Sequence, residues 1–313
     1  MSRGAAPIGA IGVVGAGAVG QATAAALVSS GLASRLLVTS RTSSRTAALV
    51  TDLDDMRTAL RGSTHPLTSH PADLMDCDAV VVALRASFTN SRATDVRMAG
   101  ASANGALVAW LAGKLRGYGG TVLMVTNPVD LMARLFADAS GCRRVYGIGS
   151  ALDTARYRTM LAAHVGAPLA AVSGQVIGEH GDHLVVCASS TTVNDEPADV
   201  PVRVIFNELC SRPGRISAGI GRTRYGPAGA VLEALHLALG LADGTTQLST
   251  AYQGGWLGIP LRFTAGQPIP CLPRLTPGEA AHFRAADAKL RTAYEALGPV
   301  LDPIPSLSER TLP

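Results

Sequence analysis

Several features that mark particular classes of protein are scarce in this sequence. Only 16% of the 313 residues are charged, and the basic residues are scattered rather than gathered in runs, which argues against a nucleic-acid binder. Lysine is almost missing: of 27 basic residues only Lys114 and Lys289 are lysine, which leaves 25 arginines. Arginine binds carboxylates and phosphates through its planar guanidinium. We therefore expect a small molecule as the partner.

Paired cysteines are also missing. The five cysteines are odd in number, widely spaced and without a CxxC pair, which argues against a disulfide framework and against a zinc site. His180 and His183 are close in sequence, but no third ligand at a recognisable spacing accompanies them, so we expect no metal. Free cysteines are typical of a reducing compartment, and we expect a cytoplasmic protein.

Charge is absent from residues 4–34, and Arg3 before them resembles the start of a signal peptide or a membrane span. The stretch is too rich in glycine and small polar residues for a membrane, and its centre reads Gly-Ala-Gly-Ala-Val-Gly. A buried strand, a tight turn and a buried helix explain it better. We therefore expect no association with a membrane.

Short apolar runs alternate with longer helical patterns in the first half of the chain, as in a parallel sheet with crossover helices. The sequence predicts an α/β protein: a Rossmann-type doubly wound domain over residues 1–149, then an α+β substrate domain over residues 150–313. Strands are expected at Ile8 to Val14, Arg35 to Thr39, Ala79 to Ala83, Thr121 to Val125, Ala171 to Ile177, Leu248 to Tyr252 and Leu261 to Thr264. Helices are expected at Gln21 to Ser30, Thr46 to Leu60, Met98 to Leu115, Pro128 to Ala139, Leu152 to Val165, Val202 to Leu209, Ala228 to Leu241 and Gly278 to Leu297.

A GxGxxG motif lies between the first expected strand and the first expected helix. Gly15 permits a tight turn, Gly17 lets the backbone approach a pyrophosphate, and Gly20 allows close packing of helix on sheet. Ala18 and Val19 lie where the helix begins and offers N–H groups to phosphates. We expect these residues to bind a dinucleotide; a glycine-rich turn without a ligand is the alternative.

No acidic residue ends the second expected strand, where an NAD-binding unit carries Asp or Glu for the adenosine ribose. Residues 40–45 read Ser-Arg-Thr-Ser-Ser-Arg instead. A carboxylate there would repel a 2′-phosphate, whereas hydroxyl and guanidinium groups can bind one. The sequence predicts NADP(H) in preference to NAD(H), with contacts from Ser40, Arg41, Ser43 and Arg45. A solvated loop whose arginines bind nothing is the alternative.

Three later segments carry residues suited to the reduction of a 2-oxo acid, which needs a hydride source, an acid near the carbonyl oxygen and a cation for the carboxylate. His180 titrates near neutral pH and suits the acid, and Asp153 would fix its tautomer and stabilise the imidazolium. Arg156 follows Asp153 by three residues, on the same helix face, and can bind a carboxylate with two hydrogen bonds. Each residue alone has an ordinary structural explanation, but together they favour catalysis. The segments are Val125 to Asp130, Leu152 to Arg158 and Gly178 to Asp182.

With the glycine loop, these segments resemble the L-lactate/L-malate dehydrogenase family in order and spacing over nearly the whole chain. The resemblance implies an NAD(P)-dependent 2-hydroxy acid dehydrogenase in which His180, Asp153 and Arg156 have the roles given above. It places Asn127 near the nicotinamide ribose and the substrate. It also implies a homodimer or homotetramer.

The resemblance breaks after the third expected strand. The family has a small-residue turn there, then a mobile loop with a substrate-selecting residue and an arginine that polarises the carbonyl, but residues 84–97 lack the usual glycine and proline and include extra residues. Counting back from Asn104, which falls at a family asparagine, places Arg97 at the polarising position; a solvated residue at a helix start is the alternative. The selecting position falls at Ser91 or Arg92. An inward Arg92 would imply recognition of a second anionic group, and an inward Ser91 a neutral side chain.

Two wall residues also differ from the family. Arg85 replaces a small turn residue and is a candidate to bind the cofactor pyrophosphate or a distal anion, and Ala228 stands where we expect the family threonine. These changes argue against plain lactate or malate turnover. We expect an NADPH-dependent reductase of a 2-oxo acid with a distal anionic group, such as a dicarboxylate or a phosphonopyruvate-like acid. An NADP-linked malate dehydrogenase and a non-catalytic cofactor-sensing protein are the alternatives.

Overall fold

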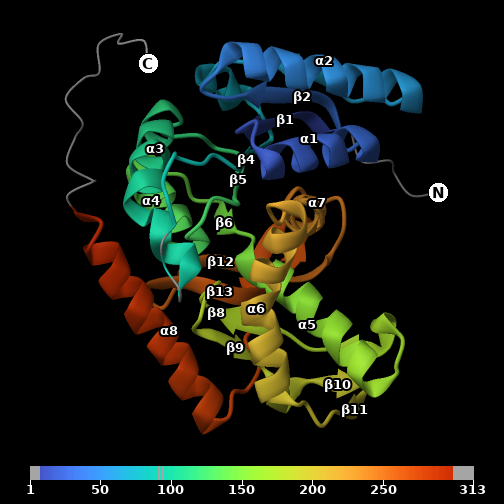
Figure 1. Ribbon diagram of the computed structural model, residues 1–313, viewed down its shortest axis with the longest axis vertical. Helices are drawn as coiled ribbons and strands as arrows, with labels where there is room; N and C mark the ends of the chain where they lie inside the picture. Colours follow the sequence, from blue (N-terminus) through green and yellow to red (C-terminus); the bar gives the residue numbers. More distant parts are fainter. Residues whose placement is uncertain (1–7, 91, 93–94, 299–313) are drawn as a thin grey trace.

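One large mixed sheet joins the two halves of the chain (Figure 1). The computed structural model describes residues 8–90, 92 and 95–298. The strands of the large sheet are β1 (Ile8–Val14), β2 (Ala33–Thr39), β3 (His65–Thr68), β4 (Ala79–Val82), β5 (Thr121–Met124), β6 (Val145–Gly147), β8 (Val176–Gly178), β9 (Leu184–Val186), β12 (Gly244–Tyr252), β13 (Gly255–Thr264) and β14 (Gln267–Pro270). A small sheet contains β7 (Val172–Ser173), β10 (Thr192–Val193) and β11 (Glu196–Pro197). The α-helices are α1 (Ala18–Ser30), α2 (Ser43–Leu60), α3 (Ala101–Lys114), α4 (Val129–Ser140), α5 (Gly149–Val165), α6 (Val202–Ile220), α7 (Tyr225–Ala238) and α8 (Pro277–Glu295).

The first half forms a parallel sheet in the order β3-β2-β1-β4-β5-β6. This order, which reverses between β1 and β4, is that of a Rossmann-type doubly wound sheet, so the predicted fold class is confirmed. Strands β3 and β6 were not predicted from the sequence. In β3 only Pro66 is buried, and β6 is three residues long, so neither strand provides an apolar run long enough to recognise.

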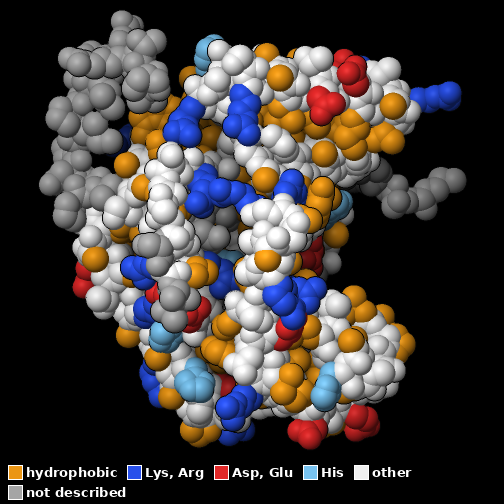
Figure 2. Space-filling model, in the orientation of Figure 1, with side chains coloured by type: hydrophobic (Ala, Val, Ile, Leu, Met, Phe, Trp, Pro, Cys, Tyr) orange, Lys and Arg blue, Asp and Glu red, His pale blue; other side chains and the backbone are white. Residues whose placement is uncertain are grey.

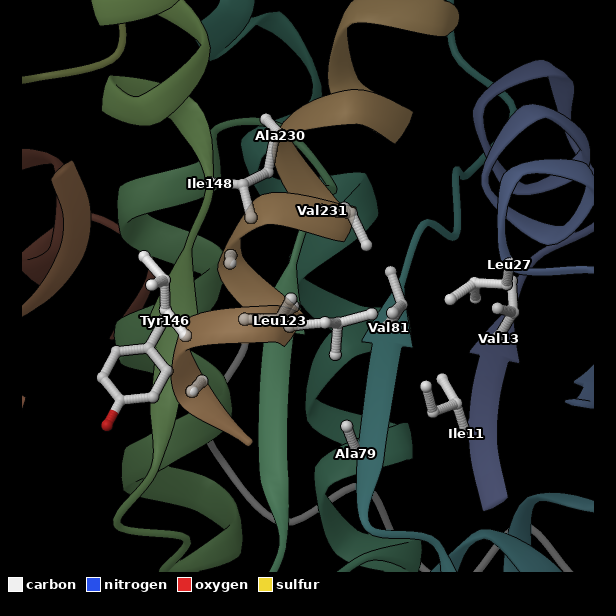
Figure 3. Packing of buried hydrophobic residues seen from close by; sticks show 14 of the residues in the cluster. Ile11, Val13, Leu27, Ala79, Val81, Leu123, Tyr146, Ile148, Ala230 and Val231 are labelled. Atoms are coloured by element: carbon white, nitrogen blue, oxygen red, sulfur yellow. The ribbon is translucent and has the colours of Figure 1, made fainter. Parts of the chain in front are cut away.

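Helices cover both faces of the parallel sheet. Successive side chains of a strand point to opposite faces, so β1 contributes to both of the buried clusters. On one face Ile11 and Val13 pack with Leu27 of α1 and Val231 of α7 (Figure 3). On the other face Val14 belongs to a cluster with side chains of α3 and α4. Burial on both faces explains why β1 is a continuous apolar run.

The second half extends the sheet with antiparallel strands. β12 and β13 form a long hairpin, and β12 meets β6 through the single pair Ser249 and Gly147. α8, red in Figure 1, runs along one side of the molecule and packs on β13 and β9. α5, which carries Asp153 and Arg156, begins at Gly149, immediately after β6, and so starts at the edge of the Rossmann-type sheet. The domain boundary near residue 150 stays a prediction.

Several expected elements of the second half are wrong in extent, and the strands expected from Leu248 and from Leu261 begin earlier, at Gly244 (β12) and Gly255 (β13). The expected strand from Ala171 to Ile177 is divided into β7 and β8, which join different sheets. Gly174 lies between them and packs so closely on the ring of Tyr157 that a Cβ would approach it to 2.7 Å. The expected helix from Val202 to Leu209 is the longer α6, which continues through Pro213. A proline removes one backbone donor, and here the helix goes on without it.

Candidate active site

The turn after β1 has the geometry of a dinucleotide-binding loop. Gly15 has φ +117°, and a Cβ there would lie 2.5 Å from the carbonyl oxygen of Ala83. A Cβ on Gly20 would overlap the carbonyl oxygen of Gly15. Nothing lies within 4 Å of a Cβ on Gly17, and α1 begins at Ala18 without a side-chain cap. Open space next to uncapped N–H groups fits the pyrophosphate of a dinucleotide.

The residues expected at a 2′-phosphate lie where β2 ends and α2 begins. Arg41, Ser43 and Arg45 are all exposed. Arg45 lines the large cavity in the middle of the molecule, and Arg41 and Ser43 lie outside its lining. The hydroxyl of Ser40 is 2.7 Å from that of Thr46. The first turn of α2 contains no acidic residue. This corner therefore presents two guanidinium groups and no carboxylate that would repel a phosphate.

His180, Asp153 and Arg156 meet in the protein interior, and all three are buried. His180 follows β8, and its Nδ1 lies 2.6 Å from Oδ2 of Asp153 on α5. Arg156, one helical turn further, donates from Nη1 to Oδ1 of Asp153 at 3.4 Å. The backbone N–H of His180 donates to Asp130 of α4 at 2.9 Å, and Gly149 packs so tightly on the imidazole that a Cβ would overlap it. The imidazole is therefore held by contacts from several elements.

Burial and neighbouring charges act on the pKa values of this pair. Burial lowers the pKa of His180, the Arg97 charge lowers it further, and Asp153 opposes both. Burial alone would raise the pKa of Asp153, but the charge and hydrogen bond of His180, together with Arg97 and Arg156, hold this pKa at about 2. Asp153 is therefore ionised and accepts a hydrogen bond from Nδ1–H, which leaves Nε2 of His180 as the nitrogen available to a substrate.

Arg97 lies on the short 3₁₀ helix η2 (Val96–Gly100). The expected single helix from Met98 to Leu115 is wrong, because η2 and α3 divide this segment. Arg97 lines the same cavity as His180 and Arg156. Its Nη2 is buried and has no hydrogen-bond partner among the described residues. Leaving a buried donor unsatisfied is costly, so this nitrogen is suited to a ligand oxygen.

Asn127 lines the cavity at the end of β5, and the Asn127–Pro128 peptide bond is cis. The side chain of Asn104 donates to the carbonyl oxygen of Asn127 at 2.7 Å. Its Oδ1 accepts from the backbone N–H of Ala86 at 2.8 Å. Asn104 thus connects the segment after β4 to the segment after β5 on the floor of the cavity.

Some residues expected at the substrate lie elsewhere. Arg92 is exposed and lines a second hollow beside α8, not the cavity of His180. Ala228 does not line the cavity either, because α7 begins at Tyr225 and its first turn directs Ala228 into the core. Thr223 and Pro227 form that wall. The other candidate for the selecting position, Ser91, lies outside the described residues.

Arg85 lines the cavity, with its guanidinium carbon 4.1 Å from the ring centre of Phe88. Arg222, in the turn between α6 and α7, lines the same cavity and was missed by the sequence analysis. Arg222 lies outside every motif. Its position directly after Gly221 predicts only that it lies in a loop, not that it faces the cavity. Burial lowers the pKa of Arg85, and the charge of Arg222 lowers it further. The two guanidinium groups therefore influence each other.

The cavity as a whole is strongly basic. It has a volume of about 580 Å³, and no acidic residue is among its lining residues in the described part of the chain. Figure 2 shows basic side chains gathered around the hollow in the middle of this face. The arginines that line it are Arg45, Arg85, Arg97, Arg156 and Arg222.

Neither a metal site nor a membrane helix is found in residues 8–90, 92 and 95–298. No three His, Cys, Asp or Glu side chains there lie close enough to hold a metal ion. No helix in the same residues combines the length and the apolar sequence needed to cross a membrane.

Comparison with known proteins gives a consistent result. Residues 10–149 match the family model described as lactate/malate dehydrogenase, NAD binding domain. The chain is 30% identical over 226 residues to an L-lactate dehydrogenase of Halalkalibacterium halodurans, which covers 69% of this chain and 72% of that protein. It is 36% identical over 138 residues to a malate dehydrogenase of Methanosphaera stadtmanae, which covers 41% of this chain and 43% of that protein. The fold matches that of a malate dehydrogenase from Plasmodium falciparum, with a TM-score of 0.86, 18% identity, and coverage of 94% of this chain and 100% of that one.

The matches to lactate and malate dehydrogenases, together with the nucleotide loop, identify an oxidoreductase of the 2-hydroxy acid dehydrogenase class that uses a nicotinamide cofactor. The chain belongs to the lactate/malate dehydrogenase family. The resemblance noted in the sequence is thereby confirmed.

Proposed function

We propose that this chain reduces a 2-oxo acid with a distal anionic group to the 2-hydroxy acid, with NADPH as the reductant. The observation that carries the proposal is the buried pair of His180 and Asp153, with Nδ1 and Oδ2 2.6 Å apart, in a cavity that Arg97 and Arg156 also line. A reduced nicotinamide, when bound, supplies the hydride.

His180 supplies the proton. Its Nδ1–H is engaged by the ionised Asp153, so the imidazolium offers its other proton from Nε2 to the carbonyl oxygen. Transfer of that proton forms the hydroxyl group and leaves a neutral imidazole that keeps the proton on Nδ1. Asp153 stabilises the imidazolium before the transfer and fixes the tautomer after it.

Arg97 and the buried Arg156 bind opposite ends of the 2-oxo acid group. The unpaired Nη2 of Arg97 is suited to the carbonyl oxygen, where negative charge develops in the transition state. Arg156 forms one long hydrogen bond of 3.4 Å with Asp153. Its remaining N–H donors are suited to a bidentate contact with the carboxylate of the substrate.

The preference for NADPH is supported by the corner between β2 and α2. Arg41 and Arg45 supply positive charge there, and the first turn of α2 has no acidic residue. Arg45 also lines the cavity. A 2′-phosphate would satisfy these groups, and an NAD ribose would not.

The distal anion is supported by arginines that the 2-oxo acid group leaves unused. Arg85 and Arg222 line the cavity, and neither forms an ion pair with an acidic residue in the described part of the chain. A second carboxylate or a phosphonate would relieve the repulsion between them. This favours a dicarboxylate or a phosphonopyruvate-like acid.

An NADP-linked malate dehydrogenase is the nearest alternative, since its substrate also carries a second carboxylate. A cofactor-sensing protein is disfavoured, because a sensor needs no buried proton donor such as His180. The family resemblance leads us to expect a homodimer or homotetramer. The free state of all five cysteines fits the expected reducing cytoplasm.

The test is a spectrophotometric screen of cofactor oxidation that crosses NADH and NADPH with pyruvate, oxaloacetate, branched 2-oxo acids and phosphonopyruvate. We expect oxidation of NADPH with a dianionic acid, and loss of turnover but not of NADPH binding in His180→Gln. Preference for NADH would contradict the assignment of Arg41 and Arg45. Equal use of neutral and dianionic acids would contradict the distal anion site, and silence of the wild type with every pair would favour the sensor.

A further inference from the structure

Lys289 lies at the centre of an ion cluster, although the chain has only two lysines. Its Nζ, on α8, lies 2.8 Å from Oδ1 of Asp95. The same nitrogen lies 2.8 Å from Oε1 and 3.0 Å from Oε2 of Glu179. The other lysine, Lys114, is exposed at the end of α3 and forms no ion pair within the described residues.

The two partners of Lys289 belong to the two segments that carry the reacting groups. Glu179 immediately precedes His180 and is buried. Asp95 precedes Arg97 by two residues and bounds η2 at its N-terminus. Lys289 therefore bridges, from a third element of the fold, the segment of the proton donor and the segment of the carbonyl-binding arginine.

The backbone of Asp95 is held as well. Its N–H donates to Oδ2 of Asp182 at 2.8 Å. Its φ of 52° and ψ of 40° lie in the left-handed region, which residues other than glycine rarely adopt. Contacts of the side chain with Lys289 and of the backbone with Asp182 keep Asp95 in this conformation, and the turn it makes starts η2 at Val96.

The ammonium group of Lys289 separates carboxylates that would otherwise repel each other. Asp95, Asp182 and Glu179 bring three carboxylates to this junction. The other basic groups are Arg92, with Nη1 3.7 Å from Asp95, and His183, with Nδ1 3.5 Å from Glu179. Both are largely exposed and hold their partners at longer distances than Lys289 does. Removing Lys289 would leave like charges facing each other across the junction and favour movement of η2 away from Glu179.

We propose that Lys289 is a positioning residue that holds η2 against the segment of His180 and so places Arg97 at the carbonyl oxygen. The inference rests on the proposed function. Lys289 lines the second hollow and not the cavity of His180, so it contacts neither substrate nor cofactor in this role.

The kinetic test compares Lys289→Met, which keeps the length of the side chain, with Lys289→Arg and with the control Lys114→Met. We expect kcat of Lys289→Met to fall by about 10- to 100-fold, as for a misplaced transition-state group, while KM changes less because Arg156 is untouched. Lys289→Arg should restore most of the activity, because a guanidinium can bridge the same two carboxylates. Lys114→Met should match the wild type.

A structural measurement separates this inference from the proposed function. Hydrogen exchange of residues 95–104 should be faster in Lys289→Met and in Asp95→Asn than in the wild type, and the double variant should show no further increase. Asn tolerates the left-handed region, so Asp95→Asn removes the charge and keeps the turn. If these variants exchange faster but the wild type reduces no 2-oxo acid, the proposed function is refuted and the role of Lys289 in holding η2 is not.

Unchanged exchange together with unchanged kcat in Lys289→Met would overturn the proposal. So would parallel losses of kcat, NADPH binding and thermal midpoint that Lys289→Arg does not reverse, because these indicate a general effect on folding. Should Lys289→Met fail to fold, Asp95→Asn and Lys289→Arg decide the question by the same two measurements.

Discussion

Replacing Arg97 by Gln tests the catalytic assignment most sharply, because the structure predicts two separate effects. The buried Nη2 of Arg97 has no partner among the described residues, so a substrate oxygen would be its main hydrogen-bond acceptor. Loss of one preorganised donor to a developing oxyanion typically costs about 3–4 kcal/mol, which is a fall in kcat of about 10²–10³-fold. KM should change less, since Arg156 still binds the carboxylate.

The second effect is a shift of the pH profile. Reduction requires the protonated form of His180, whose pKa is lowered first by burial and then by Arg97. In the wild type kcat/KM for reduction therefore falls as the pH rises through a value below 6.5, the ordinary pKa of histidine. Without the positive charge of Arg97 this pKa rises, so the remaining activity of Arg97→Gln persists to higher pH than that of the wild type.

The assay is NADPH oxidation across the acidic and neutral pH range, at a saturating concentration of the best 2-oxo acid for kcat and at a subsaturating one for kcat/KM. Arg284→Gln, which removes an exposed arginine on α8 with no ion pair among the described residues, is the control and should match the wild type. A loss in kcat without a shift in the pH profile would refute the coupling between Arg97 and His180. An unchanged kcat would refute the assignment of Arg97 to the carbonyl oxygen.

Three further substitutions test other parts of the site. Asp153→Asn should lower kcat by about 10²–10⁴-fold with NADPH binding retained, because an amide can donate to Nδ1 and favour the unproductive tautomer of His180; rapid turnover would show that Asp153 is only structural. Arg41→Glu combined with Arg45→Glu should reverse the ratio of kcat/KM for NADPH over NADH, since carboxylates would repel the 2′-phosphate; an unchanged ratio would place the phosphate elsewhere. Arg222→Ser should reduce kcat/KM for a dianionic 2-oxo acid by about tenfold and leave that for pyruvate unchanged, and equal losses for both would argue against a distal anion site.

The glycine loop and the arrangement of Asp153 and Arg156 were accessible to sequence reasoning because the residues of each lie in one short, contiguous segment. Gly15 to Gly20 sits between a strand and a helix, and its steric demands follow from backbone geometry that any such turn requires. Asp153 and Arg156 are one helical turn apart, so a single helix fixes their relation to each other. Local periodicity is enough for such features.

The walls of the cavity were less accessible, because they depend on where a loop ends and a helix begins. Counting along the chain led to Ala228, but the start of α7 decides which residue faces the cavity, and Thr223 and Pro227 do so. Lys289 had no local signal at all, because Asp95 lies 194 residues before it in the chain. Only the packing of α8 beside η2 brings them together.

The charge of the cavity bears on the identity of its occupants. Five arginines line the cavity. Within the described residues, Asp153 is the only carboxylate that contacts the side chains of Arg156 and His180. Grouped cations with so few counter-charges repel each other, and the charge of Arg222 adds to burial in lowering the pKa of Arg85. A 2′-phosphate at Arg45 and one carboxylate at Arg156 leave Arg85 and Arg222, and a pyrophosphate at α1 is a candidate partner for Arg85 alone. A substrate with a second negative group would complete the neutralisation, whereas lactate-type acids would leave Arg222 without a counter-charge.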